Sequence, residues 1–149
     1  MTRSIKRFVS DKTGAVVIET AIVVPVLFLF ALGAVDYGTM LARNIELQNA
    51  MAEASQIALA AAPTDAAARQ AVKEVLQTST GLTTNDVSIT ERYRCGTTDA
   101  YVTDSDTCGA DPYARFIRIE IRETHEPIWA KISDAEAVNF NIVRMVQVG

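Results

Sequence analysis

The hydrophobic and polar positions divide the chain into a continuous apolar run, a stretch of helical periodicity and a region of alternating residues. The apolar run extends from Ala15 to Val35 and contains one charged residue, Glu19. It is about as long as the ~20 apolar residues that a helix needs to cross the hydrocarbon core of a bilayer. The sequence therefore predicts a transmembrane helix over residues 15–35.

Helical periodicity continues beyond the apolar run as far as Pro63. Residues 49–62 are rich in alanine, the strongest helix former. We therefore expect one long helix over about residues 15–61, in which Pro25 introduces a kink or a loosened turn. The apolar side of its outer half is expected to consist of Leu41, Ile45, Leu47, Met51, Ala54 and Ala58. Its polar side is expected to consist of Arg43, Glu46, Gln48 and Glu53.

A second, shorter helix is predicted from about Asp65 to Thr78. Pro63 ends the first helix, Asp65 is a favourable N-cap residue, and Gly81 is a typical signal for the end of a helix. The residues expected to be buried in this helix are Ala68, Val72, Val75 and Leu76.

The C-terminal part of the chain has the period-two alternation of strands. Ile117, Ile119 and Ile121 alternate with larger or charged residues, which is the clearest strand signal in the chain. Two further strands are expected near residues 87–93 and 138–148. The predicted fold class is α+β, with a long N-terminal helix, a short second helix and a small antiparallel sheet of about three strands. We expect the outer half of the first helix to pack on the isoleucine face of the sheet.

Charge is distributed unevenly along the chain. Residues 1–14 carry four basic residues and one acidic residue, whereas the whole chain has a net charge of −4. A basic flank before an apolar span is retained in the cytoplasm. The expected organisation is a basic cytoplasmic leader over residues 1–14, the transmembrane helix, and an extracytoplasmic domain over residues 36–149. The acidic outer part argues against a nucleic-acid partner, and no motif indicates a cofactor.

The chain has two cysteines, Cys95 and Cys108, in a polar segment expected to be a long hairpin loop. They form no CxxC pair, and two thiols with a single histidine make a poor zinc site. The predicted topology places them in a compartment that permits disulfides. We therefore favour a Cys95–Cys108 disulfide over two free thiols, with a contribution of roughly 3 kcal/mol for a loop of this size.

Glu19 is an unusual residue for the interior of an apolar run. A carboxylate inside a membrane costs several kcal/mol near the centre and less near the interface. Cleavage between Gly14 and Ala15 would create an α-amino group that could pair with the Glu19 of a neighbouring copy. The alternative is that Glu19 is hydrated in the cytoplasmic headgroup region.

The junction from Gly14 to Glu19 resembles the processing site of type IV prepilins, which are cut after a glycine and carry glutamate at the fifth mature position. The longer segment GAVVIETAIVVPVLFLFALGAVDYG is similar to the TadE-like family of tight-adherence (Flp-type) pilus assembly proteins. The shared features are Gly14, Glu19, Ala21, Pro25 and the Leu and Phe run that follows, and later Leu47-Gln48-Asn49-Ala50 with Glu53-Ala54-Ser55.

This resemblance implies a pilin-like minor subunit, or pseudopilin, that is not an enzyme. A prepilin peptidase would cut after Gly14, leaving Ala15 as the mature N-terminus, and Glu19 would act in assembly. Thr20 replaces the aromatic residue usual after the glutamate, which favours an accessory subunit over a major pilin. The implied partners are the lipid bilayer, the major Flp pilin, other minor pilins and the inner-membrane assembly platform. The implied location is the inner membrane, with the C-terminal domain periplasmic or extracellular, or the pilus itself.

A secretory signal peptide is the first alternative interpretation. Ala31-Leu32-Gly33 resembles a small-x-small cleavage site, which would give a mature N-terminus near Ala34. The apolar run is longer than the ~7–15 residues of a signal peptide core, and it contains Glu19.

A membrane-anchored enzyme is the second alternative. His125 stands beside Glu126, and Ser133, Asp134 and Glu136 follow, but none of them lies in a recognised catalytic motif.

A membrane-anchored or secreted binding domain unrelated to pili is the third alternative. The Cys95–Cys108 loop would then present Tyr101 and Tyr113 to a ligand, whereas aromatic residues in a closed loop more often pack against the sheet.

Overall fold

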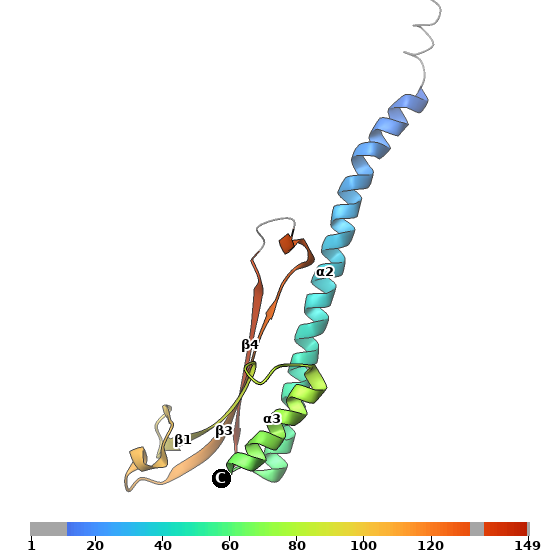
Figure 1. Cartoon of the computed structure of the whole chain (residues 1–149). Coiled ribbons are helices and arrows are strands. Elements are labelled where there is room, and N and C mark those ends of the chain that lie inside the picture. Colours follow the sequence, from blue (N-terminus) through green and yellow to red (C-terminus); the bar gives the residue numbers. More distant parts are fainter. Residues whose placement is uncertain (1–11, 132–135, 149) are drawn as a thin grey trace, which may run out of the picture. The chain divides into compact units, whose positions relative to one another are not determined.

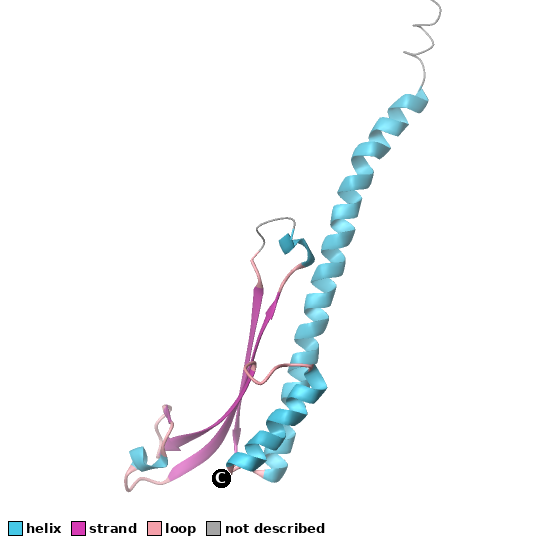
Figure 2. Cartoon of the chain, in the orientation of Figure 1, coloured by secondary structure: helices cyan, strands magenta, loops and turns pink. Residues whose placement is uncertain are grey.

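The computed structural model describes residues 12–131 and 136–148, and the chain divides into two compact units, residues 1–39 and 40–149 (Figure 1). The helices are α2 (Lys12–Ala61) and α3 (Ala66–Thr80), with short 3-10 turns η1 (Ser105–Cys108) and η2 (Ile128–Lys131). The strands are β1 (Val87–Cys95), β2 (Tyr101–Val102), β3 (Tyr113–His125) and β4 (Val138–Gln147). The predicted α+β class is confirmed (Figure 2).

Helix α2 contains 50 residues and belongs to both units. It ends at Ala61, as the sequence predicts, and it continues through Pro25 without a break. It begins at Lys12, so residues 12–14 of the predicted leader are already helical. Residues 1–11 of that leader lie outside the described residues.

Helix α3 is closed at both ends by the residues that the sequence indicates. The Asp65 side chain accepts a hydrogen bond from the backbone N–H of Ala68 at 2.7 Å. Gly81 ends the helix in the left-handed conformation, with φ at 71°, which glycine adopts at little cost. The buried residues are Val72, Leu76 and Thr80, whereas Val75 is 43% exposed. The expectation that Val75 is buried was therefore wrong, because the buried face follows a four-residue spacing that omits it.

The sheet has four strands in the order β2-β1-β3-β4, and all neighbours are antiparallel. Strands β1, β3 and β4 are the three that the sequence predicts. The additional strand β2 forms where the loop after β1 folds back, pairing Tyr93 with Val102 and Arg94 with Tyr101. Two residues are too few to produce a period-two pattern, which is why the sequence does not reveal β2.

The hydrophobic core of the second unit lies between the two helices and one face of the sheet. Ile117, Ile119 and Ile121 of β3 are fully buried, which confirms the expected packing face. The helical members of the cluster are Leu47, Ala50, Met51, Ala54 and Ala58 from α2, with Val72 and Leu76 from α3. Figure 2 shows α3 and the C-terminal half of α2 on the same side of the sheet.

Two residues assigned to the buried side of α2 face solvent instead. Leu41 is 48% exposed and Ile45 is 52% exposed. Ile45 precedes the fully buried Leu47 by two positions, which is about 200° around a helix with 3.6 residues per turn. Arg43 precedes Leu47 by four positions and therefore lies on the buried side, contrary to the sequence expectation.

We predict that Ile119→Ala lowers the free energy of unfolding of the second unit by about 2–5 kcal/mol, because it removes fully buried side-chain volume from the core. Denaturant unfolding of the full chain in detergent, followed by circular dichroism, measures this change. Val143→Ala on β4 is the control, since Val143 is 41% exposed. Equal losses for the two variants would contradict the assignment of the core.

Candidate assembly site

The N-terminal half of α2 exposes apolar side chains on all sides. The described side chains from Val16 to Ala31 are all exposed, and Phe30 reaches 73%. Within the described residues, α2 is the one helix that is long and apolar enough to cross a membrane. A helix that is apolar all round needs lipid or other apolar helices around it. This single N-terminal apolar helix fits a single-pass membrane anchor.

Glu19 lies on this apolar helix with its side chain exposed. Its neighbours one turn away are Val16, Ile22 and Val23, which are also exposed. In the part of the chain that the structure describes, the Glu19 carboxylate makes no hydrogen bond or ion pair. A carboxylate in such surroundings is stabilised by a cation or a donor from another molecule, or by water.

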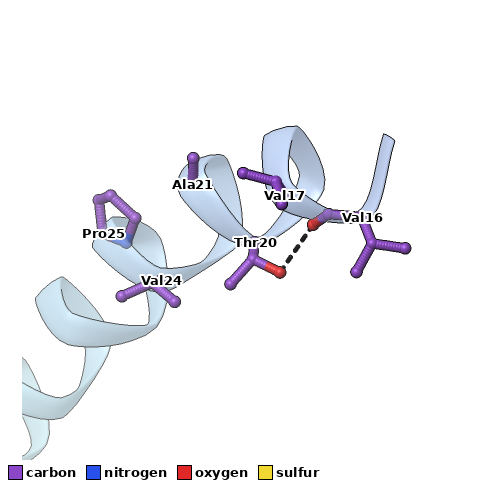
Figure 3. A pocket seen from close by; sticks show the side chains of 6 residues that line it. All are labelled: Val16, Val17, Thr20, Ala21, Val24 and Pro25. Atoms are coloured by element: carbon purple, nitrogen blue, oxygen red, sulfur yellow. Dashed lines mark hydrogen bonds between the residues drawn. The ribbon is translucent and has the colours of Figure 1, made fainter. Parts of the chain in front are cut away.

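Thr20 is compatible with an apolar environment because its hydroxyl is already satisfied. The Thr20 Oγ1 donates to the backbone carbonyl of Val16 at 2.8 Å (Figure 3).

Pro25 lacks an N–H, so the carbonyl of Ala21 loses its usual intrahelical donor. The depression in Figure 3 is shallow and open, and it is lined by Val16, Val17, Thr20, Ala21, Val24 and Pro25.

Gly14 and Ala15 both lie near the start of α2. Apart from its chain neighbours and the backbone of its own helix turn, a Cβ atom built on Gly14 meets no atom of the described residues within 4 Å. The fold therefore has no steric need for glycine at this position, although glycine lowers helix stability by about 1 kcal/mol relative to alanine. Ala31, Leu32 and Gly33 lie inside uninterrupted helix, so cleavage there would require unwinding the middle of α2.

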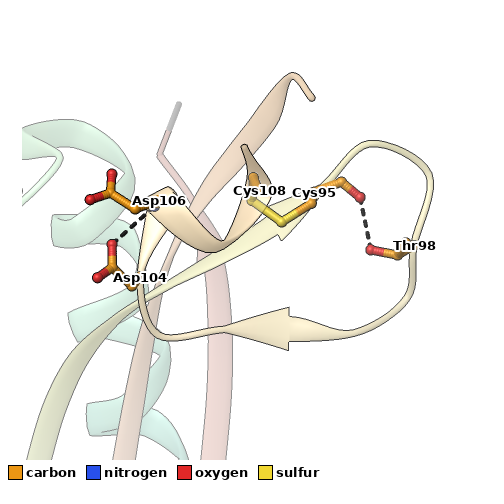
Figure 4. Close-up of a disulfide and its surroundings, with 5 residues drawn as sticks. All are labelled: Cys95, Thr98, Asp104, Asp106 and Cys108. Atoms are coloured by element: carbon orange, nitrogen blue, oxygen red, sulfur yellow. Dashed lines mark hydrogen bonds between the residues drawn. A yellow bond between two sulfur atoms is a disulfide. The ribbon is translucent and has the colours of Figure 1, made fainter. Parts of the chain in front are cut away.

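The loop between β1 and β3 is closed by a disulfide between Cys95 and Cys108, with a Cα–Cα distance of 5.2 Å (Figure 4). The Thr98 hydroxyl donates to the carbonyl of Cys95 at 2.8 Å. The Asp104 carboxylate accepts from the backbone N–H of Asp106 at 3.0 Å and caps η1. These bonds hold the loop in a defined conformation.

The aromatic residues of this loop pack against the sheet. Tyr101 meets the ring of Phe116 edge-to-face at 5.1 Å, and Tyr113 meets the ring of Tyr93 in the same way at 5.5 Å. Burial and the hydrogen bond to Glu91 raise the pKa of Tyr93. Tyr101 and Tyr113 remain about half exposed, at 44% and 48%.

Arg43 joins three elements of the second unit. Its Nε and Nη2 each donate to the Glu123 carboxylate of β3 at 2.9 Å, and Nη2 also donates to the carbonyl of Thr80 at the end of α3. The Glu123 carboxylate raises the pKa of Arg43. A lone arginine on a helix carries no sequence signal for such a contact, because its partners lie 37 and 80 residues away.

The residues of the enzyme alternative are not gathered into a catalytic arrangement in the described part of the chain. His125 is half-buried on β3 with its ring 6.3 Å from that of Phe140, whereas Glu126 and Glu136 are exposed. Ser133 and Asp134 lie outside the described residues. The described residues also contain no group of three or more His, Cys, Asp or Glu placed to hold a metal ion.

The fold and the exposed apolar helix define an α+β protein whose first helix is both a candidate membrane anchor and part of the domain core. Residues 14–56 match the family model described as TadE-like protein, so this segment is TadE-like. A TadE-like segment suggests a role in tight-adherence pilus assembly. The TadE-like family is structural and not typically enzymatic. No curated protein and no solved structure matches the chain.

We predict that Glu123→Gln destabilises the second unit by about 1–3 kcal/mol, because the three-quarters-buried Arg43 loses its buried carboxylate partner and keeps only the exposed one, Glu46. Denaturant unfolding of the full chain measures the loss. Glu46→Gln is a matched control, since Glu46 contacts the same guanidinium but is 50% exposed, and it should cost at most about 0.5 kcal/mol. A loss for Glu123→Gln no larger than that for Glu46→Gln would contradict the role assigned to the Arg43–Glu123 contact.

Proposed function

We propose that this protein is a pseudopilin, a pilin-like minor subunit used in assembling a tight-adherence pilus. The observation that carries the proposal is the TadE-like match over residues 14–56, which begins at Gly14 and continues through the apolar helix into the domain core. The matched segment contains both the exposed apolar surface that helices use to associate and the buried face that includes Leu47 and Ala54.

We further propose that a prepilin peptidase cuts the chain between Gly14 and Ala15. A peptidase must reach an extended peptide bond, and glycine lowers the cost of unwinding the start of α2. Because no described atom beyond its own helix turn lies in the space beside Gly14, the glycine is explained better by recognition than by packing.

Glu19 then pairs with the α-amino group of Ala15 on a neighbouring copy. The two positions are four residues apart, which is about 6 Å along a helix axis. Pairing between copies therefore favours helices that are staggered by about this distance. The ion pair offsets the cost of placing the Glu19 carboxylate among apolar side chains.

The proposed location is the inner membrane, with the leader in the cytoplasm and the C-terminal domain outside. The basic leader supports this orientation by the positive-inside rule. The Cys95–Cys108 disulfide supports it as well, since such bonds persist in oxidising compartments. The proposed partners are the bilayer, the peptidase, the major Flp pilin, other minor pilins and the assembly platform.

We predict that Gly14→Ala blocks processing, because the added methyl group meets the peptidase and not the chain itself. Intact-mass analysis of the protein isolated from its native membrane should then show the leader retained. Gly38→Ala is the matched control, because a Cβ atom at Gly38 also meets no atom within 4 Å. Removal of the leader from Gly14→Ala as efficiently as from the control would exclude cleavage at this junction.

We predict that Glu19→Ala inserts into the membrane normally but is not assembled, because the neighbouring amino group loses its partner. Membrane extraction measures insertion, and immunodetection in sheared surface fibres measures assembly. Glu53→Ala is the control, because Glu53 is an exposed acid elsewhere on α2. Fibres that contain the Glu19→Ala protein at the wild-type level would rule out the pairing.

A further inference from the structure

The sheet has a second face, opposite the isoleucine core, and this face is rich in arginine. Side chains alternate along a strand, so Arg118, Glu120 and Arg122 of β3 lie on the face opposite Ile117, Ile119 and Ile121. The register of β1 and β3 places Arg92 directly opposite Phe116 on this same face. We call Arg92, Arg94, Arg118 and Arg122, with Glu120 and Phe116 between them, the arginine face.

The contacts on the arginine face leave most of its positive charge unbalanced. Glu120 is 5% exposed and is held by Arg118 at 3.0 Å and by Arg122 at 2.6 Å. Arg94 lies over the ring of Phe116, with its guanidinium carbon 5.4 Å from the ring centroid. Among the strand residues described on this face, Glu120 is the only acid, so the four arginines leave a net charge of +3.

The accessibility of these arginines differs, and it shows where a partner could bind. Arg122 keeps 70% of its side chain exposed, and Arg118 keeps 33%. Residues 40–149 as a whole carry a net charge of −5. A positive face on an acidic unit is therefore a local feature, and it favours an acidic partner.

The loop closed by Cys95 and Cys108 provides such a partner. Residues 96–112 contain no Lys or Arg and carry four negative charges. All four of these acids, Asp99, Asp104, Asp106 and Asp111, are exposed. No ion pair joins them to an arginine within the described residues of the chain.

We propose that this loop of one copy docks on the arginine face of a second copy. The charges are complementary, four carboxylates against a net +3, and guanidinium groups bind carboxylates in a favourable two-point geometry. The disulfide, the Thr98 bond and the Asp104 cap already order the loop, so little conformational freedom is lost on docking.

The proposed contact joins two different patches, so it is heterologous. A heterologous contact leaves a free loop at one end of the pair and a free arginine face at the other, and it can therefore repeat into a row or a ring. This inference goes beyond the proposed function, because it requires two copies of the chain but neither cleavage after Gly14 nor a pilus.

Two charge-reversal variants of the full chain test the contact in neutral detergent. Arg92→Glu/Arg122→Glu changes the net charge of the face from +3 to −1, and Asp99→Lys/Asp111→Lys removes the net negative charge of the loop. Sedimentation velocity over a concentration series should show association weakened on the order of tenfold for each variant alone. An equimolar mixture should associate again, because the unchanged loop of the face variant, with four negative charges, meets the unchanged +3 face of the loop variant. Rising salt should weaken association of the wild type as the screening length falls from ~8 Å to ~3 Å.

Matched controls place the same charge changes elsewhere on the second unit. Lys73→Glu/Arg144→Glu matches the face variant, and Glu53→Lys/Glu74→Lys matches the loop variant. Both controls should associate like the wild type. If the reversed face unfolds the sheet, Arg92→Gln/Arg122→Gln replaces it, while the loop variant tests the same contact independently.

The proposal is overturned if the wild type stays monomeric throughout the series, or if both reversed variants associate like their controls. It is also overturned if the mixture fails to restore association. Binding of the wild type to vesicles containing anionic lipid, lost in Arg92→Glu/Arg122→Glu while Asp99→Lys/Asp111→Lys still self-associates, would instead assign the arginine face to lipid headgroups. Because all samples retain the leader, failure of Gly14 processing would leave these results unchanged.

Discussion

The fold depends on a change in the surroundings that the side chains of α2 require along its length. From Val16 to Ala31 the described side chains are exposed and nearly all apolar, so this part needs lipid or neighbouring helices. From Leu47 to Ala58 the same helix has one buried face and one exposed face. The change from apolar surroundings to a one-sided core within a single helix is what allows a membrane segment and a folded domain to share one element.

Polar contacts then fix the second half of α2 on the sheet. Hydrophobic packing against three isoleucines is strong but not directional, whereas the Arg43–Glu123 pair sets the register between α2 and β3. The additional bond from Arg43 to Thr80 brings in the end of α3. In the same way, the disulfide and its neighbouring hydrogen bonds order a loop that has few apolar residues of its own.

Patterns of regular spacing allowed much of the fold to be predicted from the sequence. The apolar run, the alternating isoleucines and the capping residue Asp65 each act locally, so they indicated α2, β3 and α3. The Arg43–Glu123 contact and the arginine face arise only when distant segments meet, whereas the two residues of β2 are too few to give a period-two pattern. Gly14 and Glu19 were recognised as a candidate site by their resemblance to a family, because their proposed partners belong to other molecules.

The N-terminal sequence of the wild-type protein, purified from its native membrane, tests the central claim most directly. If α2 begins with a processing signal and acts in assembly after cleavage, the mature protein starts at Ala15. A mature protein that starts at Met1, or near Ala34 after removal as a signal peptide, would contradict this account.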